Sequence, residues 1–227
     1  MKNIDFFLND FAPITTSMAF FEVDAKSFSE NVFRRLRKIN DDWNFPWEVE
    51  VNRVNGDFEC KLQALLPLSN QYNNFLITST KSGWVLYLSN NFINGTDVHS
   101  QPSYFSREWR IRNLSLVMVE DVPSKKPGSF QFVLRDGTSG SLKTRSVVAH
   151  KESRWEFEEY GDPLPFELLD KYKSRKIKDR LDSEMMEFYC KHFGISLFDT
   201  DFYAGEAWLI KTYPLPQAKY MNNFPNR

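Results

Sequence analysis

Apolar residues near the start of the chain recur at a helical period, which predicts a helix over residues 27–39. Ser27 and Glu30 have the spacing of a capping box, in which the hydroxyl accepts from a backbone amide and the carboxylate reaches back. The helix would bury one face, which consists of Phe28, Val32, Leu36 and Ile39.

The next segment changes to strict alternation of apolar and polar residues. Residues 47–52 and 58–64 both alternate, and Asn55-Gly56 between them favours a type I′ turn. A two-residue turn would pair Val51 with Cys60 and leave one face of the hairpin buried. The pattern therefore predicts a β-hairpin here.

Alternation and turn residues predict further strands at residues 74–79, 84–89, 113–120, 129–135, 142–149 and 154–160. Helical patterns are expected at residues 101–108, 166–180 and 183–193, with Gly194 at the end of the last helix. The chain shows no internal repeat and no clear linker. We therefore expect one α+β domain over residues 1–213, mostly antiparallel sheet with an N-terminal helix and C-terminal helices. Residues 214–227 are expected to form a loosely packed tail.

The composition is that of a globular protein with an unusual number of rings. Hydrophobic residues make up 41% and charged residues 26%, while aromatic residues reach 16% because the chain holds 21 Phe. Large rings supply much of the buried area in a core, and Trp and Tyr are also favoured as anchors at interfaces.

Charge and cysteine content indicate a cytoplasmic protein. The net charge is -1, which gives no general attraction to nucleic acid or anionic membranes. Asp5 and Asp10 interrupt the early apolar residues, so we expect no signal peptide, and no apolar run is long enough to span a membrane. Cys60 and Cys190 are too distant to suggest a disulfide framework, and both are expected to be buried thiols.

The chain lacks clustered chemistry. Its three histidines, His99, His150 and His192, are far apart, and neither they nor the cysteines have metal-ligand or nucleophile spacing. His99 and His150 are expected to be ordinary polar surface groups. The glycine-rich segment 136–140 lacks the lysine of a phosphate-binding loop. We therefore predict no catalytic residue, no cofactor and no metal, and we expect a binding protein instead of an enzyme.

Charge is segregated in the second half of the chain. One block is acidic: Glu152, Glu156, Glu158, Glu159, Asp162, Glu167 and Asp170. The block that follows is basic: Lys171, Lys173, Arg175, Lys176, Lys178 and Arg180. The basic block could contact phosphates, or the two blocks could pair with each other on a solvated surface.

The acidic block offers a candidate recognition surface. On a strand over residues 154–160, Glu156 and Glu158 would share the face opposite Trp155 and Phe157. An open face would present these carboxylates to a basic partner, whereas a solvated outer sheet face is the simpler interpretation. Both residues could also be an acid/base pair, but this spacing on a strand is common by chance.

A second signal is a resemblance over residues 83–203. It is carried by Gly83-Trp84-x-x-Tyr87, Gly95-Thr96-Asp97, Arg154-Trp155-x-Phe157, Pro165-Phe166-Glu167 and Asp179-Arg180. This pattern resembles a group of uncharacterised bacterial proteins of similar size, from which it departs at residues 121–128. The group is similar in style to the immunity proteins found beside polymorphic toxins, and it implies no catalytic residue.

These observations together predict a bacterial immunity-type protein that occludes a cognate protein toxin. Residues expected to bind this partner are Glu156, Glu158, Glu159, Asp162 and Asp97. One alternative is an RNA-binding accessory protein that uses Arg34, Arg37, Lys38 and residues 171–180, although nucleic acid is disfavoured by the net charge. The other is a small enzyme with a carboxylate site that no motif identifies.

Overall fold

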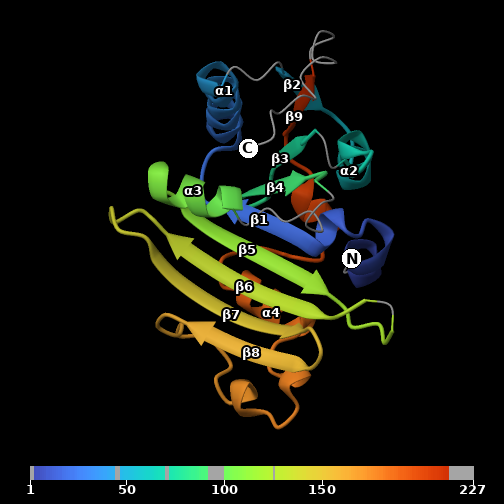
Figure 1. The fold of residues 1–227 in the computed structure, drawn as a ribbon, viewed down its shortest axis with the longest axis vertical. Helices are drawn as coiled ribbons and strands as arrows, with labels where there is room; N and C mark the ends of the chain where they lie inside the picture. Colours follow the sequence, from blue (N-terminus) through green and yellow to red (C-terminus); the bar gives the residue numbers. More distant parts are fainter. Residues whose placement is uncertain (1–2, 44–46, 70–71, 92–99, 125, 215–227) are drawn as a thin grey trace, which may run out of the picture.

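The computed structural model describes residues 3–43, 47–69, 72–91, 100–124 and 126–214. Its centre is a nine-stranded antiparallel sheet with the order β2-β9-β3-β4-β1-β5-β6-β7-β8 (Figure 1). The strands are β1 Ser17–Phe21, β2 Trp47–Val54, β3 Phe75–Ser79, β4 Val85–Ser89, β5 Arg112–Val119, β6 Ser129–Asp136, β7 Lys143–Lys151, β8 Trp155–Tyr160 and β9 Ala207–Pro214. The α+β class with a mostly antiparallel sheet is confirmed.

In the described part of the chain, four α-helices cover the sheet: α1 Ala25–Trp43, α2 Phe58–Leu65, α3 Ser100–Glu108 and α4 Ser183–Lys191. Short helical turns add η1 Phe6–Asp10, η2 Ile14–Thr16, η3 Lys171–Lys173, η4 Ile177–Asp179 and η5 Thr200–Tyr203. α2 and α4 pack on one face of the sheet, and α1 and α3 pack on the other. We call these the α4 face and the α1 face.

The two faces have separate hydrophobic cores. The core on the α4 face extends along the sheet from Leu209 on β9 to Val147 on β7 and includes Tyr189 of α4. The core on the α1 face is smaller and is restricted to β9, β3, β4 and β1, with Phe28 of α1 and Phe105 of α3 packed over them. The expected ring-rich core is present on both faces.

Chain entry into α1 differs from the predicted capping box. The helix begins at Ala25, and Asp24 Oδ1 accepts a 2.8 Å hydrogen bond from the Ser27 backbone amide. Asp24 therefore caps the helix three residues before the predicted cap, because a carboxylate is a good acceptor for the free amides of the first turn. Phe28 and Val32 are fully buried, as the helical period predicted.

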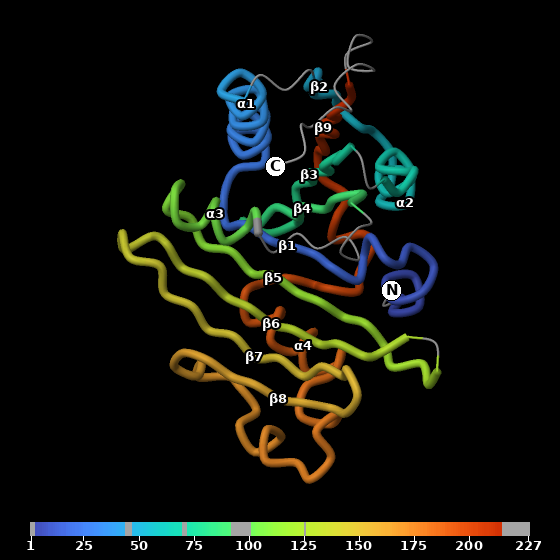
Figure 2. The backbone as a smooth tube through the Cα atoms, in the orientation of Figure 1, coloured from blue at the N-terminus to red at the C-terminus, as the bar shows by residue number. Residues whose placement is uncertain are grey.

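The hairpin predicted over residues 47–64 is wrong. β2 pairs with β9, with Val51 opposite Ile210, and these strands lie side by side although they are far apart in sequence (Figure 2). Residues Phe58–Leu65 form α2, whose first turn is capped by Asp57 Oδ1 at 2.9 Å from the Cys60 amide. Cys60 is therefore an exposed helical residue, and only Cys190 is the buried thiol that we expected.

The helix predicted over residues 166–180 is also wrong, because only the turns η3 and η4 form there. Like charges at helical spacing, such as Lys171 with Arg175 and Lys176 with Arg180, oppose a regular helix. The prediction for residues 183–193 is confirmed by α4, which Asp182 caps and after which Gly194 adopts a positive φ of 72°. The strands predicted between residues 74 and 160 are also confirmed. The expected tail after Pro214 lies outside the described residues.

Candidate protein-binding surface

The α1 face of the sheet is divided into two halves. Over β9, β3, β4 and β1, which together with the largely exposed edge strand β2 we call the covered half, the side chains are buried beneath α1 and α3. Over β5 to β8, which we call the open half, α3 reaches only the start of β5 and the end of β6, no other described helix lies in front of the strands, and α4 is behind them (Figure 1). Strand alternation identifies which side chains reach this open face.

The middle of the open face is neutral and made of short side chains. Cross-strand rows place Val117, Gln131 and Val148 side by side, and Val133 beside Ser146. Gln131 Nε2 donates a 3.1 Å hydrogen bond to Ser129 Oγ, so these two polar groups satisfy each other. We call this surface the neutral floor: Val117, Ser129, Gln131, Val133, Ser146 and Val148.

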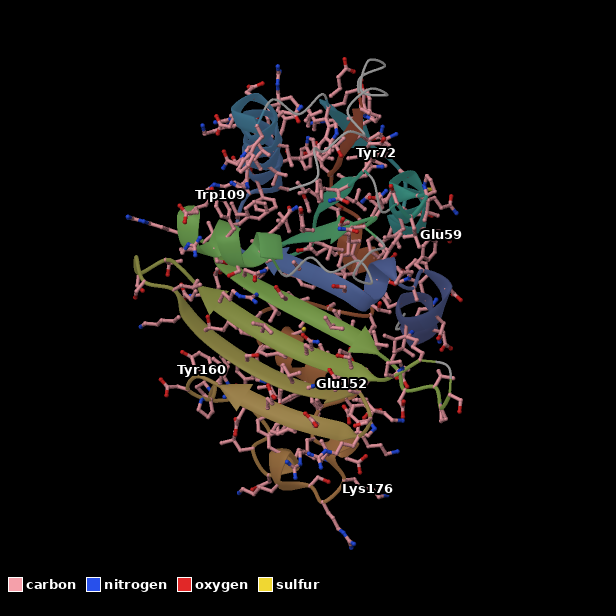
Figure 3. The ribbon with its side chains drawn as sticks, in the orientation of Figure 1. Glu59, Tyr72, Trp109, Glu152, Tyr160 and Lys176 are labelled. Carbon is pink, nitrogen blue, oxygen red and sulfur yellow. The ribbon has the colours of Figure 1, made fainter. Side chains whose placement is uncertain are left out.

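The neutral floor ends at an acidic column on β8. Glu156 lies opposite His150, Glu158 lies opposite Val148, and Tyr160 lies opposite Ser146. Tyr160 is 71% exposed and is labelled at the end of β8 in Figure 3. We call Glu156, Glu158 and Tyr160 the acidic margin.

The sequence prediction for this strand is confirmed in its orientation. Trp155 and Phe157 pack against the core of the α4 face, so Glu156 and Glu158 project from the α1 face. Arg154 Nε lies 3.4 Å from Glu156 Oε1, but its side chain is 83% exposed and such a pair contributes little. Glu158 makes no ion pair with any described residue.

Glu159 is separated from this column. Its side chain points to the α4 face, where Oε2 accepts a 2.7 Å hydrogen bond from Arg145 Nη2. Arg145 also donates to both oxygens of Glu167, at 2.9 Å from Nε and 2.6 Å from Nη2. Glu159 therefore belongs to an internal ion-pair network, and only its exposed margin is available to a partner.

Arg145 and Glu167 form the centre of this network, which we call the C-terminal lock. Their side chains are 4% and 0% exposed, and Tyr172 Oη donates to Glu167 Oε2 at 3.0 Å. Burial lowers the pKa of Arg145, but hydrogen bonds to Glu167 and Glu159 outweigh it, so the net shift is upward. Burial raises the pKa of Tyr189, whose hydroxyl lies 2.9 Å from that of Tyr172. In the lock, each of the two buried charges and each of the two phenols thus has a hydrogen-bond partner.

The remaining predicted binding residues are not part of the acidic column. Asp162 is exposed in the turn that follows β8. Asp97 and His99 lie outside the described residues. His150 is half-buried, and its Nδ1 has no hydrogen-bond partner in the part of the chain that the structure describes. His150 is therefore less exposed than the surface group that we expected.

The basic block lies beyond the β8 edge of the sheet. Figure 3 shows Lys176 pointing away from the protein there. Lys171, Arg175, Lys176 and Lys178 are exposed and form no ion pair with described residues, while Lys173 lies 3.0 Å from Asp170. Arg180 instead packs over the Phe157 ring at 5.4 Å and donates to Ser174.

Sequence reasoning missed the neutral floor and the lock. A signal for the floor was present, because alternate positions 117, 131, 133, 146 and 148 carry no charge. A signal for the lock was weaker: Arg145 interrupts the apolar positions of its strand, and only the fold brings Glu167 to it.

The described residues contain neither a cluster of metal ligands nor a helix suited to a membrane. Within the described ranges, no group of three or more His, Cys, Asp or Glu side chains could hold a metal ion. No described helix combines the length and apolar character needed to cross a membrane. No family model, curated protein or solved structure matches the chain.

Proposed function

We propose that the chain is an immunity-type protein that binds a basic protein toxin domain and blocks it by occlusion. The single observation that supports this most is the open half of the α1 face, where a neutral floor meets an acidic margin. A second reason for the proposal is the resemblance to a group of uncharacterised bacterial proteins that is similar in style to immunity proteins.

The composition of the open face favours a protein partner. Charged residues are depleted at the centre of protein interfaces, and the neutral floor has none. Solvated sheet faces instead alternate with long charged side chains. The acidic margin would guide a basic partner to the correct orientation, because complementary charge raises the association rate and opposes wrong partners.

The same face is a poor surface for RNA. Sheets that bind single-stranded RNA stack bases on aromatic side chains and attract phosphates with cations. Here Tyr160 is the aromatic member of the two groups of residues that we have named, and the two side chains that precede it on the same face of β8 are the carboxylates Glu158 and Glu156. RNA binding therefore needs the basic block beyond β8, which is a different surface.

The proposal is tested by capture of partners from native cells with a tagged protein, followed by mass spectrometry. We expect one stoichiometric partner with a basic domain. The double variant Glu156→Lys/Glu158→Lys should lose that partner and lose protection of the cell against it.

A matched control makes the same change of net charge elsewhere. Asp41 and Glu59 are exposed carboxylates on α1 and α2, away from the open half, and Asp41→Lys/Glu59→Lys should retain the partner. Equal capture by both double variants contradicts the proposal. Capture of RNA that is lost at 200 mM salt supports the alternative instead, because phosphate contacts are strongly salt-dependent.

A further inference from the structure

We infer that the occupant of the open half is a single amphipathic helix of the partner, with a seam of small apolar side chains and Lys or Arg along one side. This inference rests on the proposed function and specifies the partner's structure. Three observations support it: the helical layer of α1 and α3 covers only part of the sheet, the neutral floor is shallow, and the acidic margin is negatively charged.

The first argument is the incomplete helical layer. On the covered half, α1 and α3 bury the sheet. Beyond the part of β5 and β6 that α3 reaches, the strands of the open half continue the same sheet with no described helix over their α1 face (Figure 1). Four strands span three spacings, or about 14 Å. A helix with its side chains is about 10–12 Å wide. One helix therefore matches the open half, and helix on sheet is a standard layer arrangement.

The second argument is the chemistry of the neutral floor. Val117 and Val148 are half-buried and supply apolar contact, whereas Val133 is already buried, and Ser129 and Ser146 are short enough to leave the floor shallow. Gln131 Nε2 already donates a hydrogen bond to Ser129, so a partner that covers Gln131 does not leave this nitrogen without an acceptor. A helix can therefore approach with small and medium apolar residues at i, i+3, i+4 and i+7 spacing.

The third argument is the one-sided charge. The acidic margin lies on β8, at one edge of the sheet. Toward the opposite side, Arg135 of β6 lies on the same face as Val133 and Gln131, and its Nη1 donates to Asn113 Oδ1 at 3.2 Å and to Ser115 Oγ at 3.1 Å. A bound helix would thus meet carboxylates along one flank only, which selects cations on that flank.

The charge also disfavours a second copy of the chain as the occupant. A second copy joined through β8 would extend the sheet past Glu156 and Glu158. In a second copy these carboxylates would meet like charges across the new strand pair, which is destabilising. A helix lying on the floor avoids this contact.

The test is selection of binders from a displayed library of 18-residue sequences, unbiased in pattern, against the full protein. We expect enrichment of helical sequences with an apolar seam and Lys or Arg on one flank. Binding of the enriched helices should weaken at least tenfold for Val148→Arg and for Glu156→Lys/Glu158→Lys.

The matched control is Val51→Arg, which makes the same change on β2, at an exposed position of the same sheet. The enriched helices should bind this variant as they bind the original protein. Sequences with alternating strand patterns, binders that ignore Val148→Arg, or no enrichment would each overturn the inference. The capture experiment is independent of this result: loss of a captured partner with Glu156→Lys/Glu158→Lys, without enriched helices, would leave the proposed function standing.

Discussion

The two halves of the sheet differ in how far their α1 face is buried. Apart from its edge strand β2, the covered half is buried on both faces, and Phe28 of α1 packs there against Phe21 at 4.5 Å with Phe105 and Trp109 around it. The open half is buried on the α4 face and only in part on the other face, which carries short neutral residues and the acidic margin. The largest apolar contacts thus lie where two helical layers meet the sheet, and the α1 face of the open half has fewer of them.

The largest loss of stability is expected from Phe28→Ala, which removes a ring from the core of the covered half. The ring is fully buried among four aromatic neighbours, so its removal leaves a cavity in the core of the covered half. We expect a loss of about 3–5 kcal/mol in the free energy of unfolding. Urea denaturation measures it, and a loss below about 1 kcal/mol would mean that α1 does not secure this half.

A second large effect is expected in the C-terminal lock, which supports the open half from behind. Arg145→Met leaves Glu167 buried without its ion-pair partner, which typically costs about 3–5 kcal/mol. The double variant Arg145→Met/Glu167→Leu removes both charges and should recover much of that loss. A double variant as unstable as the single one would contradict the lock.

A smaller effect is expected at the cap of α1. Asp24→Ala should cost about 1 kcal/mol, because the Ser27 amide loses its acceptor. This hydrogen bond lowers the pKa of Asp24 below its ordinary value of 3.8. The carboxylate therefore stabilises the fold above pH 3.8, and this contribution is lost as pH falls through the lowered pKa.

The pH dependence of the stability difference shows whether Asp24→Ala acts through loss of the carboxylate charge or through the substitution itself. Thermal or urea unfolding at several pH values should show the original protein and Asp24→Ala converging in acid. A constant difference between them down to the most acidic pH that the fold tolerates would show that the carboxylate charge is not responsible.

The smallest effect on stability is expected on the open face. Glu156→Lys/Glu158→Lys changes exposed or half-exposed side chains, and surface substitutions usually stay within about 0.5 kcal/mol. Circular dichroism melts should overlay those of the original protein. Unfolding of this variant would assign the carboxylates a structural role and would remove the contrast between the halves.

The open half is also the region that the sequence predicted best. Strands β5 to β8 pair with their neighbours in the chain, so local alternation was sufficient to place them and to orient Glu156 and Glu158. The resemblance contributed no site geometry.

The covered half was predicted less well because its pairings are not local. β2 pairs with β9, which alternation within residues 47–64 could not indicate. The turn residues Asn55-Gly56 favoured a hairpin, but Asp57 capped a helix instead, and Phe58, Lys61, Leu62 and Leu65 are buried at helical spacing. The helical period was present in the sequence and competed with the alternation.

The residues that we predicted to bind a partner show the same limit at the level of side chains. Alternation could assign Glu159 to the face opposite Glu156, but only the fold brings Arg145 and Glu167 to it. The neutral floor required the register of three strands, and therefore a structure, before its residues could be seen as one surface.

We propose that the partner binds at the open half of the α1 face. Photo-crosslinking tests this binding site, with a photo-reactive amino acid at Gln131 on the neutral floor, or at Gln63 on α2 as a control, in protein bound to the captured partner. We expect a crosslink to the partner from position 131 and none from position 63. A crosslink from position 63 alone, or equal crosslinks from both positions, would show that the partner binds elsewhere.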